Sequence, residues 1–468
     1  MKFTTGTSRS ACRRWATLAV IALLGLAAYG SKYTEREILA RAVTGSRLGG
    51  QVDASTPTTA SNGPVGASTA TAPTGAALSA GPTGAGAIHT GSTQGSTSAG
   101  CSTTKTGPIL IGSVGNYSGP GGAAIGNMPR AVQIWAAEIN SKGGLCGRPV
   151  QVLVADDGGD PVRYGAIVRD MVENRHVVAF VGNGAILSAQ GGLAYHNQSR
   201  VPVIGNDCGR DDYYTSPVIA PECPIFSEGV RNVVRTGIQL TGKKRFGYLY
   251  CTEAQGCLSL DQQARGGAVA AGGGQLVFSK SISITQVDFT AECQSARDAG
   301  VELFSVFADP PTVSRVARSC VRQGYRPQYV EASVSVTVNQ SSEPGLENVA
   351  VFNPVFPFIG GSGPGIDAYQ HAIDTFAPGQ VQDGALAEGW ASARLFEVIA
   401  TRAARSSGSI TPASLDAGIL TVSGETLDGL TTALTFTPQG ARPASCYFVM
   451  RGNGQGSYTA PLGSRPQC

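Results

Sequence analysis

Charged residues are scarce in this chain. Asp, Glu, Lys and Arg make up 14% of its 468 residues, and the body of the chain has no run of more than three Lys or Arg. Phosphate binding needs clustered basic side chains, so the composition argues against a nucleic-acid partner. Only four His are present, and neither a Cys-x-x-Cys nor a Gly-x-Ser-x-Gly sequence occurs. We therefore expect no metal site and no serine hydrolase.

A single long apolar run lies near the N-terminus, between Arg14 and Lys32. Its 17 uncharged, mostly apolar residues follow Arg9, Arg13 and Arg14. Positive charge before an apolar core is typical of export, and this core is intermediate in length between a signal peptide and a full membrane span. Residues 1–48 are therefore expected to be an export signal or a membrane anchor. Either alternative predicts a periplasmic or cell-surface protein, linked to the membrane through this segment alone.

The next segment, residues 49–107, is dominated by Gly, Ala, Ser, Thr and Pro. Asp53 is its only charged residue before Lys105. A segment of this composition cannot bury enough apolar surface to offset its ordering entropy, so we expect a disordered linker.

Eleven cysteines support export, because disulfides persist in oxidising compartments. With Cys12 set aside, ten remain, and they fall into neighbouring pairs. We expect five disulfides, although sequence alone does not prove connectivity. The expected pairs are Cys101 with Cys146, Cys208 with Cys223, Cys251 with Cys257, Cys293 with Cys320, and Cys446 with Cys468.

The folded part opens with a strand, a glycine-rich loop and a helix, within residues 108–144. The apolar run 109–111 precedes a Gly/Ser/Pro loop. Apolar residues then recur at spacings of three and four, which predicts an amphipathic helix that Gly143 and Gly144 end. Such α/β units bind ligands where strand ends meet loops.

Strand-like and helix-like segments continue to alternate in two blocks, 108–226 and 240–335. The strands are continuous apolar runs, as expected when helices cover both faces of a parallel sheet. The sequence therefore predicts an α/β fold with parallel sheets in two Rossmann-like lobes. The expected strands are 148–155, 177–182, 201–205, 245–250, 302–307 and 328–333, and the expected helices are 160–174, 186–199, 257–271, 288–299 and 311–324.

The order and spacing of several short motifs resemble the periplasmic binding proteins of the branched-chain amino-acid type. These motifs are Ser118-Gly119-Pro120, Glu138-Ile139-Asn140, Gly143-Gly144, and Asp156-Asp157 followed by Pro161. The order of elements continues to match to about residue 450. The resemblance implies the type I fold, in which three crossover strands join two lobes that close on a ligand. The expected lobes are 108–228 plus 359–434, and 229–358 plus 435–468, with crossovers near 227–240, 353–358 and 435–445.

The resemblance also implies a solute-binding protein that delivers a small polar ligand, such as an amino acid, to an ABC-type permease and its ATPase. It places ligand groups in the loops after the third and fourth strands, where helix N-termini offer free N–H groups. These loops hold Asn183, Gly184 and Ser188, and Asn206 and Asp207. Asp207 would repel a carboxylate but could hold an amine or a sugar hydroxyl.

Five further residues follow predicted strands and are candidate ligand contacts. Tyr117 and Ser118 lie in the first loop, where Tyr117 could instead anchor the loop. Glu253 lies within the expected Cys251–Cys257 loop, and Asp309 could instead cap the next helix. Glu331 ends the strand 328–333.

The sequence also suggests functions other than solute transport. Residues 119–124 fit a Gly-x-Gly-x-x-Ala dinucleotide fingerprint, but their loop is too long and Pro120 lacks a donor N–H. We therefore expect no enzyme and no cofactor. The same fold would also suit a membrane-tethered ligand sensor or a ligand-free interaction scaffold, and the sequence does not separate these from transport.

Overall fold

The computed structural model describes residues 107–119 and 121–468. The predicted export segment 1–48, nearly all of the linker 49–107 and Cys101 lie outside these residues, and those predictions stay untested. Within the described part, none of the helices combines the length and apolarity that a membrane span requires.

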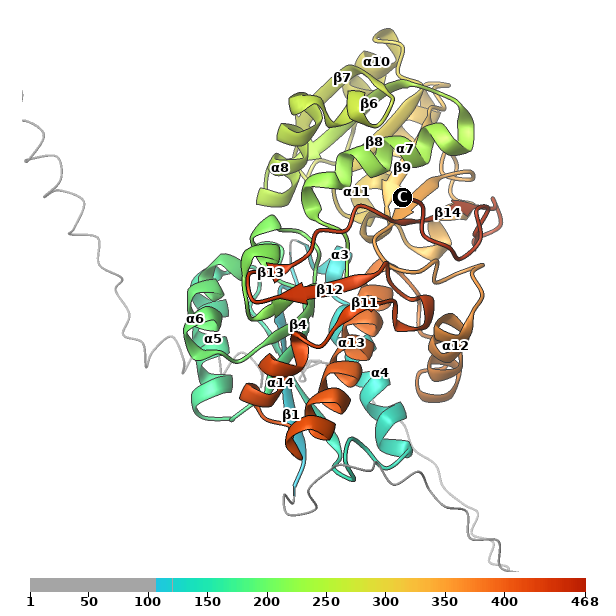
Figure 1. Ribbon diagram of the computed structural model, residues 1–468. Helices are drawn as coiled ribbons and strands as arrows, with labels where there is room; N and C mark the ends of the chain where they lie inside the picture. The colour runs from blue at the N-terminus through green and yellow to red at the C-terminus, as the bar shows by residue number, and fades with distance from the viewer. Residues whose placement is uncertain (1–106, 120) are drawn as a thin grey trace, which may run out of the picture. The chain divides into compact units, whose positions relative to one another are not determined.

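The first lobe is built on a sheet of five parallel strands in the order β2-β1-β3-β4-β5 (Figure 1). Its central strands are apolar and buried, as the continuous apolar runs predicted. The strands are β1 Ile109–Gly115, β2 Val150–Asp156, β3 Ala179–Asn183, β4 Val203–Asn206 and β5 Ile219–Ala220.

Helices cover both faces of this sheet. Asp160 caps α5, because its carboxylate accepts hydrogen bonds from the N–H groups of Val162 and Arg163. The expected helix 186–199 is shorter than predicted, because its first part is an irregular turn followed by a 3-10 turn. The elements are α3 Gly122–Ile125, α4 Met128–Ser141, α5 Pro161–Glu173, η1 Ala189–Gly191, α6 Leu193–Ser199 and η2 Asp211–Thr215.

Two buried helices, α4 and α13 (Gly384–Ser407), pack against each other beside the sheet. A side chain at Gly389 would place its Cβ 2.4 Å from the carbonyl oxygen of Met128, so only glycine permits this approach. Trp135 packs edge-on against Phe396, with ring centroids 5.7 Å apart. The start of α13 is therefore held rigidly against the first lobe.

The second lobe has a seven-stranded sheet in the order β15-β14-β10-β9-β8-β6-β7. Strands β10, β9, β8, β6 and β7 are parallel, whereas β14 and β15 add an antiparallel edge. The strands are β6 Arg245–Cys251, β7 Gln275–Ile282, β8 Leu303–Phe307, β9 Gln328–Ala332, β10 Ala350–Asn353, β14 Phe448–Gly452 and β15 Tyr458–Thr459.

Sequence reasoning missed or misplaced several parts of this lobe. Strand β7 was not predicted, and the segment 229–241, expected to contain a crossover, is helix α7, which packs on β9 and β10. The expected helix 257–271 is broken by a π-helical turn, in which Gly267 has φ 107°. The elements are η3 Phe226–Glu228, α7 Gly229–Thr241, α8 Gln255–Gln263, η4 Ala264–Ala268, α9 Val269–Ala271, α10 Thr290–Asp298, α11 Pro310–Arg322, η5 Ser333–Ser335 and η6 Val338–Ser342.

The chain passes between the two sheets three times, within 221–228, 354–363 and 442–447. The strands β12 and β13 precede the third passage and contact β5 and η2 of the first lobe. We therefore propose that this lobe continues to about residue 441, beyond the predicted boundary at 434. The remaining elements are α12 Pro364–Phe376, α14 Pro412–Ile419, β11 Ser423–Glu425, η7 Leu427–Gly429, β12 Leu434–Thr437 and β13 Gly440–Ala441.

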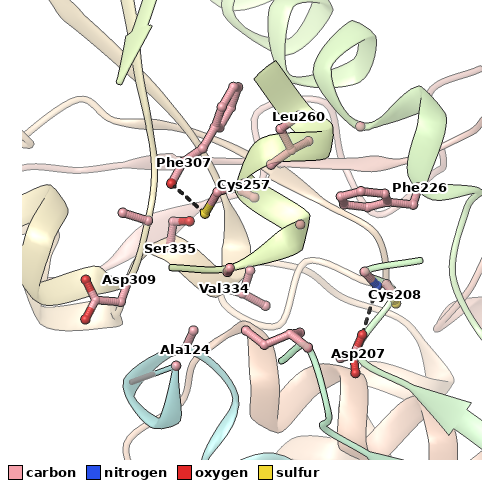
Figure 2. Close-up of a pocket in the computed structure, with 18 of the residues that line it drawn as sticks. Ala124, Asp207, Cys208, Phe226, Cys257, Leu260, Phe307, Asp309, Val334 and Ser335 are labelled. Atoms are coloured by element: carbon pink, nitrogen blue, oxygen red, sulfur yellow. Dashed lines mark hydrogen bonds between the residues drawn. The ribbon is translucent and has the colours of Figure 1, made fainter. Parts of the chain in front are cut away.

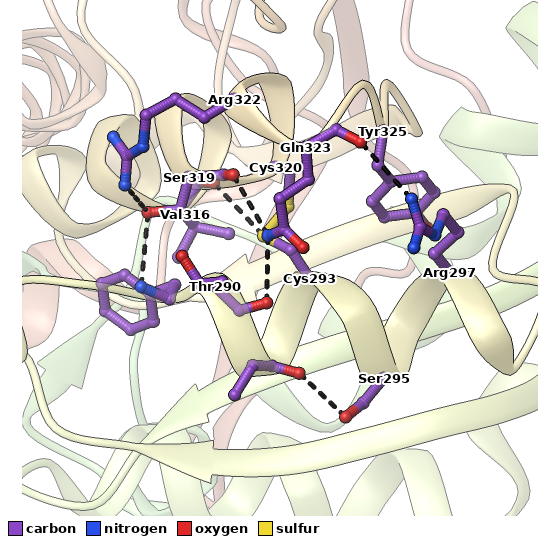
Figure 3. The surroundings of a disulfide bond; sticks show 12 residues. Thr290, Cys293, Ser295, Arg297, Val316, Ser319, Cys320, Arg322, Gln323 and Tyr325 are labelled. Atoms are coloured by element: carbon purple, nitrogen blue, oxygen red, sulfur yellow. Dashed lines mark hydrogen bonds between the residues drawn. A yellow bond between two sulfur atoms is a disulfide. The ribbon is translucent and has the colours of Figure 1, made fainter.

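Four of the predicted disulfides are present. Cys293 of α10 joins Cys320 of α11, and Gln323 ties the same two helices by donating to the carbonyl oxygen of Thr290 at 2.9 Å (Figure 3). The expected Cys101–Cys146 pair stays a prediction. The other confirmed pairs are Cys208–Cys223, Cys251–Cys257 and Cys446–Cys468.

Candidate functional site: the cleft between the two sheets

A cleft of about 200 Å³ lies where the carboxyl ends of the two parallel sheets face each other. Leu187 and Asp207 follow β3 and β4 of the first lobe, whereas Glu253 and Asp309 follow β6 and β8 of the second. In the second sheet these loops flank the point where the strand order reverses, between β6 and β8. In the first sheet that point lies between β1 and β3, and Ala124 and Leu187, which follow those two strands, both line the cleft. Open α/β sheets bind ligands at this kind of crevice.

The second lobe contributes a largely apolar wall. Leu260 of α8, Phe307 at the end of β8, and Ile284 line the cleft, together with Phe226 from the first crossing segment. Figure 2 shows Leu260 and Phe307 on one side of the cleft, with Ala124 and Asp207 on the opposite side. Such a wall gains free energy by burying an apolar ligand surface.

All the charged residues that line the cleft are acidic. They are Asp207, Glu253, Asp309 and Glu388, and no Lys, Arg or His occurs among the lining residues that the structure describes. A lining with acids and without bases disfavours an anionic ligand.

Asp207 occupies the main-chain donors that the family resemblance assigned to a ligand. One carboxylate oxygen accepts from the N–H of Ala185 at 2.7 Å, and the other accepts from the N–H of Gly209 at 3.0 Å. Burial raises the pKa of Asp207 to about 6. A ligand carboxylate would have to compete with this internal one for the same N–H groups.

Two further buried acids lie behind Asp207. Glu222 accepts from the N–H of Asn206 and from the hydroxyl of Ser392, both at 3.0 Å, and burial raises its pKa to about 8. Glu388 lies in the second turn of α13, and its Oε2 has no hydrogen-bond partner. Burial, and then the charges of Glu222, Asp207 and Asp383, raise the pKa of Glu388 well above its usual value.

Three of the sequence-predicted ligand residues line the cleft: Asp207, Glu253 and Asp309. Glu253 is exposed and accepts from the N–H of Ile284 at 3.2 Å, which ties its loop to the end of β7. Asp309 caps α11 by accepting from the N–H of Thr312 at 3.2 Å, the alternative role that the sequence allowed. Their contact with a ligand stays a prediction.

The first predicted loop is tied to the protein itself. Tyr117 lies 2.9 Å from the hydroxyl of Ser113, and its N–H donates to Asp156 at 3.0 Å. Ser118 donates to the other oxygen of Asp156. Neither Tyr117 nor Ser118 is among the residues that line the cleft, and their bonds fit the anchoring of the loop. Their contact with a ligand stays a prediction.

The predicted residues after β3 and β4, other than Asp207, also lie outside the lining. Asn183 accepts from the N–H of Val114 at 3.0 Å and donates to Tyr164 at 3.0 Å, and Ser188 donates to Asp157 at 2.8 Å. The carbonyl oxygen of Gly184 accepts from Asn116, and the side chain of Asn206 accepts from the N–H of Cys208. Each of these four residues therefore has an internal partner, although the Nδ2 of Asn206 has none, and their contact with a ligand stays a prediction.

Glu331 was expected at the cleft but is fully buried in the second sheet. Its carboxylate accepts from the N–H of Val306 at 3.0 Å, and burial raises its pKa well above the usual value. It therefore stabilises the junction of β8 and β9 and does not reach the cleft lining.

Sequence reasoning missed Glu388, Ser333 and the apolar wall. A signal for Glu388 was present, because it is the only charged residue in the small and apolar stretch 384–393. Ser333 and the wall residues carry no local signal, since only the fold brings them together.

Cys208, Cys223 and Glu222 lie close enough to suggest a metal site. However, the two sulfur atoms share a disulfide, so neither is a thiolate that could bind a metal.

The sequence of this chain matches a family of known proteins. Residues 108–457 match the family model described as periplasmic binding protein. The chain therefore belongs to the periplasmic binding protein family, whose members bind solutes outside the cytoplasm and do not act as enzymes.

Solved structures of ABC-transporter binding proteins share the fold. One is a branched-chain amino acid ABC transporter protein from Thermus thermophilus with bound valine, which is 15% identical with a TM-score of 0.66 and covers 77% of this chain and 97% of that one. Another is a fatty acid ABC transporter substrate-binding protein from Thermomonospora curvata, at 18% identity, TM-score 0.64 and coverage of 76% and 93%. A third, from R. palustris in complex with benzoate, has 13% identity, TM-score 0.62 and coverage of 77% and 97%. At these identities the likeness shows the fold alone.

Proposed function

We propose that this protein binds a small solute in the cleft between its lobes and delivers it to an ABC-type permease driven by an ATPase. The observation that carries the proposal is the position of the cleft. Loops from the carboxyl ends of both parallel sheets line it, so a ligand there contacts both lobes at once. Closure of the lobes on the ligand would produce the shape that a permease recognises.

The cleft suits a ligand with a substantial apolar body better than the small polar ligand that the sequence suggested. Leu260, Ile284, Phe307 and Phe226 provide an apolar surface, and Asp207 takes the N–H groups that an amino acid's carboxylate would need. The solved structures named above include proteins for valine, a fatty acid and benzoate, so the fold accepts ligands with large apolar parts.

The N-terminal region would hold this binding domain at the membrane or direct its export. An anchor in residues 1–48 followed by a linker over 49–107 would keep the domain near its permease. The confirmed disulfides are consistent with an extracytoplasmic location.

A thermal-shift screen followed by small-angle X-ray scattering tests the proposal. The oxidised protein is screened against amino acids, fatty acids, aromatic acids, alkylamines and alcohols. A true ligand raises the melting temperature, since it binds only the folded form. The same ligand should reduce the radius of gyration at saturation. A panel without any stabilising compound, or a stabilising compound that leaves the scattering unchanged, contradicts binding by lobe closure.

A further inference from the structure

Two buried polar groups that line the cleft have no partner within the protein. Glu388 is 1% exposed with Oε2 unpaired, and Ser333 is 1% exposed with its hydroxyl unpaired. An unpaired buried polar group costs free energy, so native structures rarely keep one unless another molecule satisfies it. The two groups come from opposite lobes, Glu388 from α13 and Ser333 from η5 after β9.

The fold brings these groups to one side of α13. A Cβ on Gly384 would lie 2.7 Å from the hydroxyl oxygen of Ser333, so Ser333 packs directly over the first turn of the helix. Glu388 lies four residues further along, and residues at this spacing share a helix face. One ligand group placed beside this face is therefore within reach of both lobes.

The surroundings of Glu388 favour a cation. Its electrostatic neighbours are Glu222, Asp207 and Asp383, and Asp383 itself accepts from the N–H of Leu386 as the cap of α13. These neighbours are acids, and the described lining of the cleft adds two further acids and no base. A positive charge is stabilised in such a site, whereas a carboxylate is repelled by it.

We propose that Glu388 and Ser333 hold the ammonium group of an amine whose remaining body is apolar. This inference rests on the proposed solute-binding function and names its ligand class. The positive charge of the ammonium favours the ionised form of Glu388, which releases its proton to solvent as the ligand binds. The ammonium then donates to the Glu388 carboxylate and to the Ser333 hydroxyl oxygen, and the apolar body packs on Leu260 and Phe307. A ligand held in this way bridges the lobes and so stabilises the closed form.

Three ligands that differ only in the head group test the inference: hexylamine, hexanol and hexanoate. Their affinities for the full-length oxidised protein are measured by isothermal titration calorimetry. We expect hexylamine to bind at least tenfold more tightly than hexanol, and hexanoate to bind more weakly than either.

Two variants separate the polar contact from general effects on folding. Glu388→Gln keeps the shape of the side chain but removes its charge, and should weaken hexylamine binding at least tenfold while changing hexanol binding less than twofold. Ser333→Ala should weaken hexylamine about threefold to tenfold. Glu173→Gln on the exposed face of α5 is the matched control for charge and should change neither affinity.

The outcomes distinguish this inference from the proposed function. Tight binding of hexanoate with lobe closure would leave solute binding intact and overturn the amine assignment. Hexylamine binding that survives Glu388→Gln unchanged would also overturn it, because the ammonium would then lie elsewhere. If none of the three compounds binds, and the broader screen finds a ligand without an amine, the assignment fails while the function stands.

Discussion

The two walls of the cleft differ in chemistry, although parallel sheets of similar design carry both. The first lobe presents Asp207 and Glu388, with Glu222 buried behind them, and its main-chain donors are already occupied by Asp207. The second lobe presents Leu260, Ile284 and Phe307, and its two acids, Glu253 and Asp309, already accept main-chain hydrogen bonds in their own loops. In the binding mode that we propose, one wall selects the head group of the ligand, while the other buries its body.

This difference shows how one fold can change its ligand without changing its architecture. One aspartate in a strand-end loop supplies an internal carboxylate, and this carboxylate occupies the N–H groups that could otherwise bind an anion. The strands, the crossings and the cleft stay the same, because apolar burial in the two sheets determines them.

The largest predicted effect concerns the acidic wall and the pH dependence of stability. The pKa of Glu222 is about 8 in the folded protein, against 4.5 ordinarily. Between these values the folded state keeps a proton that the unfolded state has lost, so the free energy of unfolding falls as the pH rises from 4.5 to about 8. In Glu222→Gln this contribution is absent, and the loss of stability between pH 5 and pH 8 should be roughly 3 kcal/mol smaller.

Denaturant unfolding of both proteins at the two pH values measures this effect. Glutamine can still accept from Asn206 and Ser392, so the variant should fold. Glu173→Gln serves as the control and should keep the wild-type slope. Equal slopes for Glu222→Gln and the wild type would show that Glu222 is not held protonated in the folded state.

The second prediction concerns a polar substitution in the apolar wall. Leu260→Asn keeps the approximate size of the side chain but places an amide against the apolar body of the ligand. We expect the affinity for the best ligand of the screen to fall by about 2 kcal/mol, close to thirtyfold, because the amide is desolvated without a partner. Calorimetry measures the loss, and Leu260→Met should stay within a factor of three. A wild-type affinity in Leu260→Asn would mean that the ligand does not contact this wall.

The third prediction, with the smallest expected effect, concerns a substitution in the first wall that should favour anion binding. Asp207→Ala frees the N–H groups of Ala185 and Gly209, and we expect the affinity for hexanoate to rise about tenfold, or 1.4 kcal/mol. Asp207→Asn is the matched control, since its amide oxygen still accepts from the loop, and it should give a smaller gain. An equal gain in both variants would attribute the effect to the lost charge alone.

The sequence predicted much of the fold because the signals were local. Continuous apolar runs predicted β1, β3 and β4. Neighbouring cysteines predicted four disulfides. Helix α7 was missed because the family's crossover was expected over the same residues, and the structure places the chain's passage just before it.

The candidate site was less predictable. The rule that ligand groups follow strands correctly placed Asp207, Glu253 and Asp309 at the cleft, since the carboxyl ends of parallel strands meet at one edge. The same rule does not say whether a side chain turns toward the cleft or into the protein, and Ser188, Asn183 and Glu331 lie outside the cleft lining. Their hydrogen bonds to Asp157, Val114 and Val306 decide that question.

The sequence by itself predicted the α/β class, the two-lobed organisation and the four confirmed disulfide pairs, because apolar periodicity and cysteine spacing act over short stretches of chain. Only the tertiary structure decided which polar groups meet at the cleft and which of them are paired. Ser333 and Glu388 are 55 positions apart and belong to different lobes, and Asp207 takes its two donors from separate loops. Which polar groups pair and which stay free depends on contacts between distant segments, and no local pattern encodes those contacts.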